Sequence, residues 1–214
     1  MSKEPRTKGE RTRARILDSA AELFSRSGFN AVSLREIAAR AGLTHAGLLH
    51  HFPGKEQLLI EVLSRRDEAD AAWLFPRILE PAAPEPPPAE RLRRVVELVG
   101  RNSRTPGLVG LYAKLSVEAS GPDHPAHRYF VERYRRLRAE LGALLGALFA
   151  AADPPVRAEP QAVAVQLLAL LDGLQTQWLL EPGAVSMEES VRDFLGRYGL
   201  PVEREAARGG RLTG

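Results

Sequence analysis

Apolar residues recur at intervals of three and four along almost the whole chain of 214 residues, which is the spacing of one face of an α-helix. The clearest stripe lies in segment 124–151 and consists of Phe130, Tyr134, Leu137, Leu141, Leu144 and Leu148. No stretch of useful length alternates apolar and polar residues as a half-buried strand does. The spacing predicts an all-α fold and argues against a β-sheet.

Glycines and prolines divide this pattern into about nine predicted helices. A proline-rich segment at 81–88 separates four of them from the other five, because proline lacks an N–H donor and disfavours helix before it. The first four are expected at 9–27, 33–42, 44–52 and from 55 towards Leu79. The others are expected at 89–103, 107–119, 124–151, 160–181 and 187–198.

Local signals mark the ends of the early helices. Ser33 and Glu36 have the spacing of a capping box, in which each side chain accepts a hydrogen bond from a free backbone N–H. Gly28 is expected to end the first helix in a left-handed conformation, and the second helix is expected to end at Gly42. Thr44 is a candidate N-cap for the third. The order helix, tight glycine turn, helix is typical of a helix-turn-helix.

Charge is distributed unevenly along the chain. Up to Lys55 there are ten basic and five acidic residues, whereas the remainder carries slightly more acidic than basic residues. A positive N-terminal region suits contact with a polyanion. The chain has no cysteine, so disulfides and cysteine-bearing metal sites are excluded. No uninterrupted apolar run approaches the roughly 20 residues that span a bilayer, and a cytoplasmic protein that does not enter the membrane is expected.

The segment between Arg13 and Glu56 carries a more specific pattern. It contains ARILDSAAELF at 14–24, GF at 28–29, IA at 37–38, AGLT at 41–44 and HFPGKE at 51–56. These elements, in this order and spacing, resemble the DNA-binding domain of the tetracycline-repressor (TetR) family of transcriptional regulators. The rest of the chain is similar to the family only in the number and order of its helices.

The resemblance implies three regions: a DNA-binding domain with a basic arm at 1–55, a regulatory, ligand-binding and dimerisation domain at 56–202, and a tail at 203–214. The composition of the tail predicts disorder. The resemblance further implies a homodimer that binds a near-palindromic DNA operator and is released by a small-molecule effector. It implies no enzymatic activity, no cofactor and no metal.

The third predicted helix would read DNA in the major groove. Leu48 and Phe52 are expected to face the first two helices, which leaves the opposite face to contact bases. Lys55 and the Thr44 helix start would contact phosphates. The predicted DNA-binding residues are Arg35, Thr44, His45, Ala46, Gly47, Leu49, His50 and Lys55. Ala46 and Leu49 depart from the family, which often has glycine at the first position and a phosphate-contacting tyrosine at the second.

The segment 160–181 is apolar nearly all round, which implies two packing partners, one of them a second subunit. Polar groups inside such a helix need partners, and ligand cavities between helices combine aromatic and apolar walls with a few polar groups. The predicted ligand-binding residues are Trp73, Tyr112, Tyr129, Asp172, Gln175 and Trp178. Each of them is also an ordinary candidate for the core.

Two other functions are compatible with parts of the sequence. His124 and His127, spaced i, i+3 with Asp123 adjacent, are compatible with the metal centre of a hydrolase. The sequence fixes no convincing third ligand, and a solvated helix start or a capping arrangement is the more frequent explanation of such a group. Alternatively, the basic arm from Lys3 to Arg15 is a solvated charge run, or binds RNA or acidic proteins in a helical interaction module. For His45 and His50 the alternative interpretation is two exposed helix positions that have no function.

Overall fold

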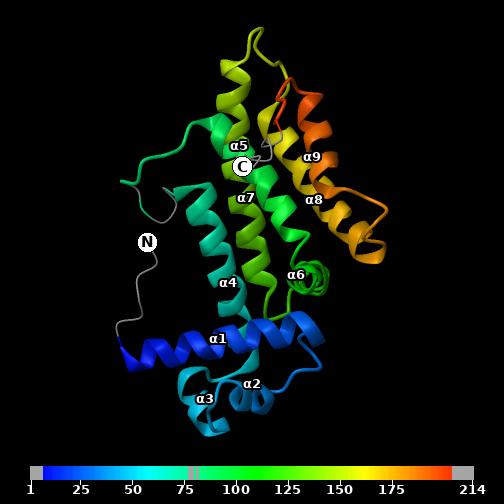
Figure 1. Ribbon diagram of the computed structural model, residues 1–214. Helices are drawn as coiled ribbons and strands as arrows, with labels where there is room; N and C mark the ends of the chain where they lie inside the picture. The colour runs from blue at the N-terminus through cyan, green and yellow to red at the C-terminus, as the bar shows by residue number, and fades with distance from the viewer. Residues whose placement is uncertain (1–6, 77–79, 81, 204–214) are drawn as a thin grey trace, which may run out of the picture.

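The computed structural model describes residues 7–76, 80 and 82–203, and in these ranges the chain forms nine α-helices and no strand (Figure 1). The all-α prediction is confirmed. The helices are α1 (Lys8–Ser27), α2 (Leu34–Arg40), α3 (His45–His51), α4 (Lys55–Leu74), α5 (Pro88–Asn102), α6 (Pro106–Glu118), α7 (His127–Ala151), α8 (Pro160–Leu180) and α9 (Met187–Gly196). Three predicted features lie wholly or partly outside the described residues: the first six residues of the basic arm, Leu79, and the tail beyond residue 203.

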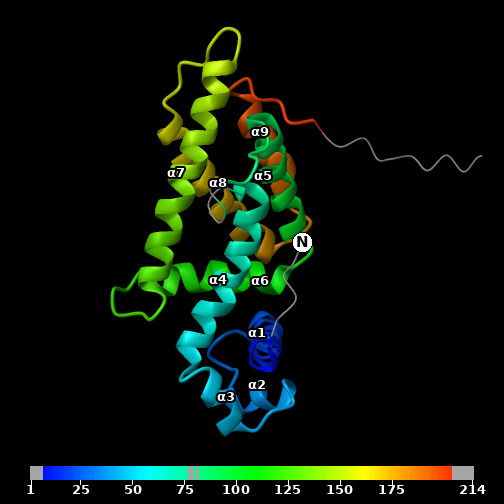
Figure 2. The same ribbon diagram turned by 90° about the vertical axis from the view of Figure 1, so that its left-hand side faces the viewer.

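The helices form two groups along the length of the molecule (Figures 1 and 2). In both views α1, α2 and α3 lie together at one end, and α4 leads away from them into the bundle of α5 to α9 (Figures 1 and 2). α6 lies crosswise between α1 and the long helices, and α7 packs along α8 through the largest helix interface of the fold. α4 is therefore the helix that connects the two ends directly.

The predicted helix signals at the N-terminal end are present in the structure. Ser33 and Glu36 form the expected capping box of α2. Gly28 and Gly42 have φ angles of 80° and 67°, a region that glycine adopts without a steric penalty. A second capping box, between Thr7 and Glu10, starts α1. Here threonine takes the place of serine in the same signal, and α1 begins at Lys8, one residue before the predicted start.

Two helices differ from their predicted bounds by three residues or more, and in both cases a proline is the reason. α7 begins at His127 instead of 124, because Pro125 disfavours a helical conformation at the residue before it, and a turn occupies this stretch. α4 ends at Leu74, followed by Phe75 with φ −138° and ψ 69° immediately before Pro76. Its predicted extension to Leu79 does not occur over the described residues.

The buried apolar side chains form two cores. The N-terminal core joins α1 to α3 with the first half of α4, and it also includes Leu111, Leu115 and Phe130 from α6 and α7. The C-terminal core joins the end of α4 to α5, α7, α8 and α9. α4 contributes to both cores, with Leu58 in the first and Leu74 in the second, so movement of this helix affects both.

α8 has an unusual surface. By length and composition it could cross a membrane, yet only 33% of its apolar stretch is buried. Val165 and Leu180 are 50% and 82% exposed in the single chain. A helix that packs in the core or interface of a water-soluble protein meets the same criteria of length and composition. These exposed apolar side chains lie on the helix for which a second packing partner was predicted.

Candidate nucleic-acid interface and internal cavity

The short helix α3 has one buried and one exposed face. Leu48 and Phe52 are completely buried against the neighbouring helices. Thr44 caps the helix, because its hydroxyl accepts the N–H of Gly47 at 3.0 Å. A Cβ at Gly47 would lie 3.2 Å from that hydroxyl oxygen, so the glycine leaves room for the cap. The exposed face consists of His45, Ala46, Leu49 and His50.

Several cations near α3 are already engaged within the protein. Arg40 pairs with Glu22, and this hydrogen bond holds the pKa of the exposed carboxyl below its usual range. The ammonium of Lys55 donates to the carbonyl oxygen of Asn30 at 3.3 Å and lies 4.4 Å from the centre of the Phe29 ring. A phosphate contact by Lys55 would compete with these interactions.

Other cations at this end have no such partner. Within the described part of the chain, no ion pair holds Arg11, Arg15 or Arg35, and all three are exposed. Arg35 lies on α2, next to the capping box of Ser33. These side chains are free to contact a polyanion, and Arg35 is among the residues predicted to bind DNA.

An internal cavity of about 140 Å³ lies between α4, α5, α6, α7 and α8. Of the residues predicted to bind a ligand, Tyr112, Asp172 and Gln175 line it. The other three do not line it. Trp73 stacks with Arg101, the hydroxyl of Tyr129 donates to the lining residue Asp67, and Trp178 is buried in the C-terminal core. Apolar side chains make up most of the remaining wall, among them Phe75, Val99, Val109, Leu137, Leu141 and Leu168.

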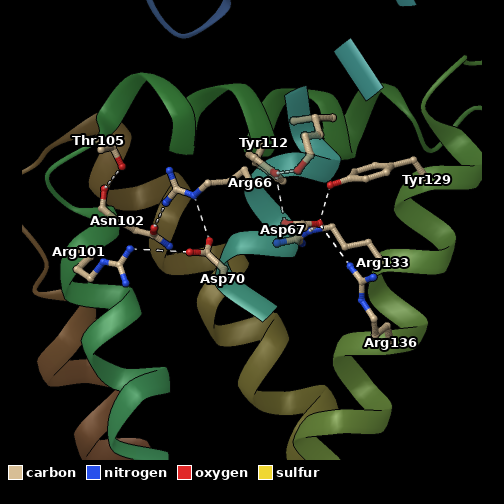
Figure 3. A network of polar contacts seen from close by, with 11 residues as sticks. Arg66, Asp67, Asp70, Arg101, Asn102, Thr105, Tyr112, Tyr129, Arg133 and Arg136 are labelled. Atoms are coloured by element: carbon tan, nitrogen blue, oxygen red, sulfur yellow. Dashed lines mark hydrogen bonds and ion pairs between the residues drawn. The ribbon is translucent and has the colours of Figure 1, made fainter. Parts of the chain in front are cut away.

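A buried carboxylate, Asp67 of α4, is the centre of a polar network beside this cavity (Figure 3). It accepts the hydroxyls of Tyr112 at 3.2 Å and Tyr129 at 2.5 Å, and the Nε–H of Arg133 at 2.8 Å. Arg136 lies 3.9 Å away. Burial, followed by the charge of Asp67, raises the pKa of the Tyr112 hydroxyl, so the ring remains a donor. The network ties α4 to α6 and α7.

The second polar network of the wall is centred on Arg66. Its guanidinium pairs with Asp70 at 3.1 Å and donates to the side-chain oxygen of Asn102 at 2.9 Å, while Arg101 lies 3.9 Å from Asp70 (Figure 3). Asp67 and Asp70, the two α4 carboxylates that line the cavity, are thus both paired with arginines. Arg66 and Asp70 are four positions apart on α4. The other partners belong to different helices and are separated by 31 positions (Arg101–Asp70) to 69 positions (Arg136–Asp67), so sequence spacing did not predict either network.

Asp172 is the lining carboxylate for which the structure gives no ion pair within the described residues. Its oxygen accepts the hydroxyl of Tyr134 at 2.7 Å. Burial raises the pKa of Asp172, although this hydrogen bond and the nearby Arg133 act in the opposite direction. Burial and the bond to Asp172 raise the pKa of Tyr134 to about 12. Asp172 and Gln175 are therefore the polar groups on the α8 side of the cavity.

The residues considered for a metal hydrolase have other roles. The Nδ1 of His124 accepts the N–H of Ala126 at 3.1 Å, and the Nδ1 of His127 lies 2.8 Å from the carbonyl oxygen of Ala119. Over the described ranges, no three His, Cys, Asp or Glu side chains come close enough to hold a metal ion. The geometry gives the hydrolase hypothesis no support.

Two family models match the chain. The model for bacterial regulatory proteins of the tetR family matches residues 16–62, and the model for the C-terminal domain of BetI-type transcriptional repressors matches residues 88–198. The first covers α2 and α3 with most of α1 and the start of α4, and the second covers α5 to α9. The helix-turn-helix and the helical bundle are therefore each recognised separately.

Individual proteins match over most of the chain. The HTH-type transcriptional regulator BetI of Rhizobium meliloti is 32% identical over 84% of this chain and 83% of its own. The regulator AcrR of Shigella flexneri is 25% identical over 91% of both chains. A transcriptional regulator from Saccharomonospora viridis, solved in complex with choline, superposes with a TM-score of 0.71 at 24% identity, over 91% of this chain and 99% of that chain.

Proposed function

Because the chain belongs to the TetR family of DNA-binding transcriptional regulators, we propose that it is a homodimeric repressor with a near-palindromic operator and a small-molecule effector. In this proposal α3 reads base edges in the major groove, and residues 56–202 form the regulatory and dimerisation domain. Occupation of the internal cavity favours a conformation that releases the DNA.

The observation that carries the proposal is the two-sided construction of α3. Leu48 and Phe52 anchor one side, and His45, Ala46, Leu49 and His50 are exposed on the other. The small side chain of Ala46 allows close approach of the helix backbone to the groove, and the two imidazoles can donate to or accept from base edges. Leu49, 38% exposed, offers an apolar contact such as a thymine methyl.

Support for the homodimer comes from α8. Its exposed apolar side chains would be covered if it packed against its symmetry mate, with α9 completing a four-helix bundle. A two-fold dimer sets its two recognition helices about 34 Å apart, one turn of DNA, which selects an operator with two-fold symmetry. The expected oligomeric state is measured by analytical ultracentrifugation, with Leu180→Glu as the variant that weakens association.

The cavity supports an effector that changes the protein's shape. At about 140 Å³ it is close to the size of an engineered cavity of about 150 Å³ that holds benzene. A larger molecule enters only if α4 moves relative to α6 and α7. Similar proteins were solved with ligands of different chemistry, choline in the Saccharomonospora viridis regulator and lauroyl-CoA in Thermus thermophilus FadR. Fold similarity therefore does not select the effector.

The decisive experiment is footprinting on the DNA that flanks the protein's own gene. We expect wild type to protect an imperfect palindrome and the double variant His45→Ala/His50→Ala to lose this protection. Lys114→Ala, an exposed substitution on α6, is the control and should leave the footprint intact. Gel-shift titration of the protected duplex with a metabolite panel then searches for the effector.

Two results would contradict the proposal. Uniform, salt-labile coverage of all sequences would indicate general polyanion binding, as in the interaction-module hypothesis. A footprint that is unchanged in the double histidine variant would remove His45 and His50 from the reading face. If no compound in a broad panel changes the affinity, the effector part of the proposal fails while the DNA-binding part stands.

A further inference from the structure

Arg13 is an arginine of α1 whose side chain contacts three parts of the N-terminal core. Its Nη1 donates to the carbonyl oxygen of His51 at 2.8 Å. Its other terminal nitrogen pairs with both carboxylate oxygens of Glu61 on α4. The guanidinium carbon lies 4.1 Å from the centre of the Phe52 ring, which is itself completely buried. One side chain thus joins α1, the end of α3 and α4.

These contacts meet a specific need of α3. The helix has seven residues, and isolated helices of that length are unstable in water, so its conformation depends on tertiary contacts. The last carbonyl groups of a helix have no partner within it, and the C-terminal end of the helix dipole favours a cation. His51 is the last residue of α3, and the guanidinium of Arg13 supplies both a donor and a positive charge there.

The same contacts restrict any other use of Arg13. Its side chain is 38% exposed, and the Glu61 carboxylate and the His51 carbonyl occupy its terminal nitrogens. A phosphate contact would have to displace at least one of these acceptors. Arg15, two positions along the same helix, is exposed and has no ion pair within the described residues. The basic side chains of α1 are therefore of two kinds. Arg11 and Arg15 are exposed to solvent, whereas Arg13 contacts α3 and α4.

We infer that Arg13 is a positioning residue, which fixes the reading face of α3 relative to α1 and α4 and makes no DNA phosphate contact. This inference rests on the proposed reading role of α3. Through Glu61 the position of α3 follows that of α4, the helix that also carries Asp67 six residues later. The arginine therefore links the recognition helix to the helix that forms one wall of the cavity.

The test compares Arg13→Ala with Arg15→Ala, two substitutions on one helix that remove the same charge. Affinities for the footprinted duplex and for a scrambled duplex of equal length are measured by fluorescence anisotropy at several salt concentrations. For Arg13→Ala we expect about a tenfold or greater loss on the specific duplex, little change on the scrambled one, and an unchanged salt dependence. A lost phosphate contact would instead weaken both complexes and reduce the slope of log K against log salt by about 0.9.

Amide hydrogen exchange of the free proteins gives a second readout that does not depend on DNA. We expect faster exchange across 45–52 in Arg13→Ala, with other helices unchanged, and wild-type exchange in Arg15→Ala. If Arg13→Ala does not fold, Arg13→Lys takes its place, because lysine keeps the charge but cannot make the two-sided contact with Glu61 and His51. For Arg13→Lys we expect the same pattern with a smaller loss.

The outcomes separate the inference from the function on which it rests. If wild type does not distinguish the two duplexes, the proposed function fails, and hydrogen exchange alone decides whether Arg13 fixes α3. Equal losses on both duplexes with a reduced salt slope would make Arg13 a phosphate contact and overturn the inference. Unchanged exchange across 45–52 together with full specific affinity would overturn it as well.

Discussion

The helix-turn-helix and the junction between the two cores bury different kinds of side chain. Behind α3 the interior is apolar, with Leu48 and Phe52 completely buried. At the junction, α4 faces α6 and α7 through the carboxylate of Asp67, two tyrosine hydroxyls and the guanidinium of Arg133 (Figure 3). Packed apolar groups hold a single shape because a change in volume is costly, whereas a buried polar network is stable only while each charge keeps its partner. We therefore expect the junction to depend on individual side chains more strongly than the helix-turn-helix does.

The strongest test of this contrast is Asp67→Ala. The substitution leaves the guanidinium of Arg133 without its nearest carboxylate, and removing one partner of a buried ion pair costs about 3 to 5 kcal/mol. We expect this loss in urea unfolding followed by circular dichroism. Asp123→Ala, an exposed aspartate before α7, is the control. A loss below about 1 kcal/mol would mean that Arg133 finds another partner, and that the junction is no more demanding than the surface.

Leu48→Ala tests the apolar core behind α3, and we expect it to lower the free energy of unfolding somewhat less than Asp67→Ala does. The side chain is completely buried, and a leucine-to-alanine change in such a position costs about 3 kcal/mol. Leu49→Ala is the matched control, because this neighbour is 38% exposed. Both tryptophans lie outside the helix-turn-helix, so their fluorescence reports the rest of the molecule.

The tryptophan signal sharpens the interpretation of Leu48→Ala. If the unfolding midpoints followed by fluorescence and by circular dichroism fall by the same amount, the two cores unfold as one unit. If circular dichroism alone shows an early transition, the helix-turn-helix unfolds separately. Equal destabilisation by Leu48→Ala and Leu49→Ala would contradict the assignment of the two faces of α3.

The smallest expected effect concerns alkaline pH and the cavity side of the junction. Tyr134 has its pKa raised to about 12 by burial, with a contribution from Asp172, whereas an unfolded tyrosine titrates near pH 10. Stability that is present below about pH 10 is therefore lost as the pH rises towards 12, because the unfolded chain releases the proton first. After allowance for solvent screening of a half-buried ring, we expect about 1 kcal/mol between pH 9 and 11.

The variant that tests this effect is Tyr134→Phe, which should lose less stability than wild type over the same pH interval. Tyr198→Phe, a half-buried tyrosine near the C-terminus, is the control. All four tyrosines lie beyond the helix-turn-helix, so tyrosinate absorbance follows this part of the protein selectively. An identical pH dependence in wild type and Tyr134→Phe would show that the Tyr134 hydroxyl contributes no pH-dependent stability to the junction.

Much of the DNA-binding end was predictable because its signals are local. The Ser33 capping box, the positive φ angle of Gly28 and the burial of Leu48 all follow from residues within a few positions of one another. The residues that line the cavity were less predictable. Tyr112, Asp172 and Gln175 line the cavity and Trp73, Tyr129 and Trp178 do not, since aromatic or polar character in a helix does not say which cavity the side chain faces.

The sequence by itself determined the helices, their ends and the resemblance to a family, since hydrophobic period, capping and glycine turns act over one or two helical turns. Only the tertiary structure decided which charges meet. Arg13 reaches Glu61 across 48 positions and Asp67 reaches Arg133 across 66. Such pairs depend on how whole helices pack, and an arginine in the sequence looks the same whether it faces DNA, solvent or a buried carboxylate.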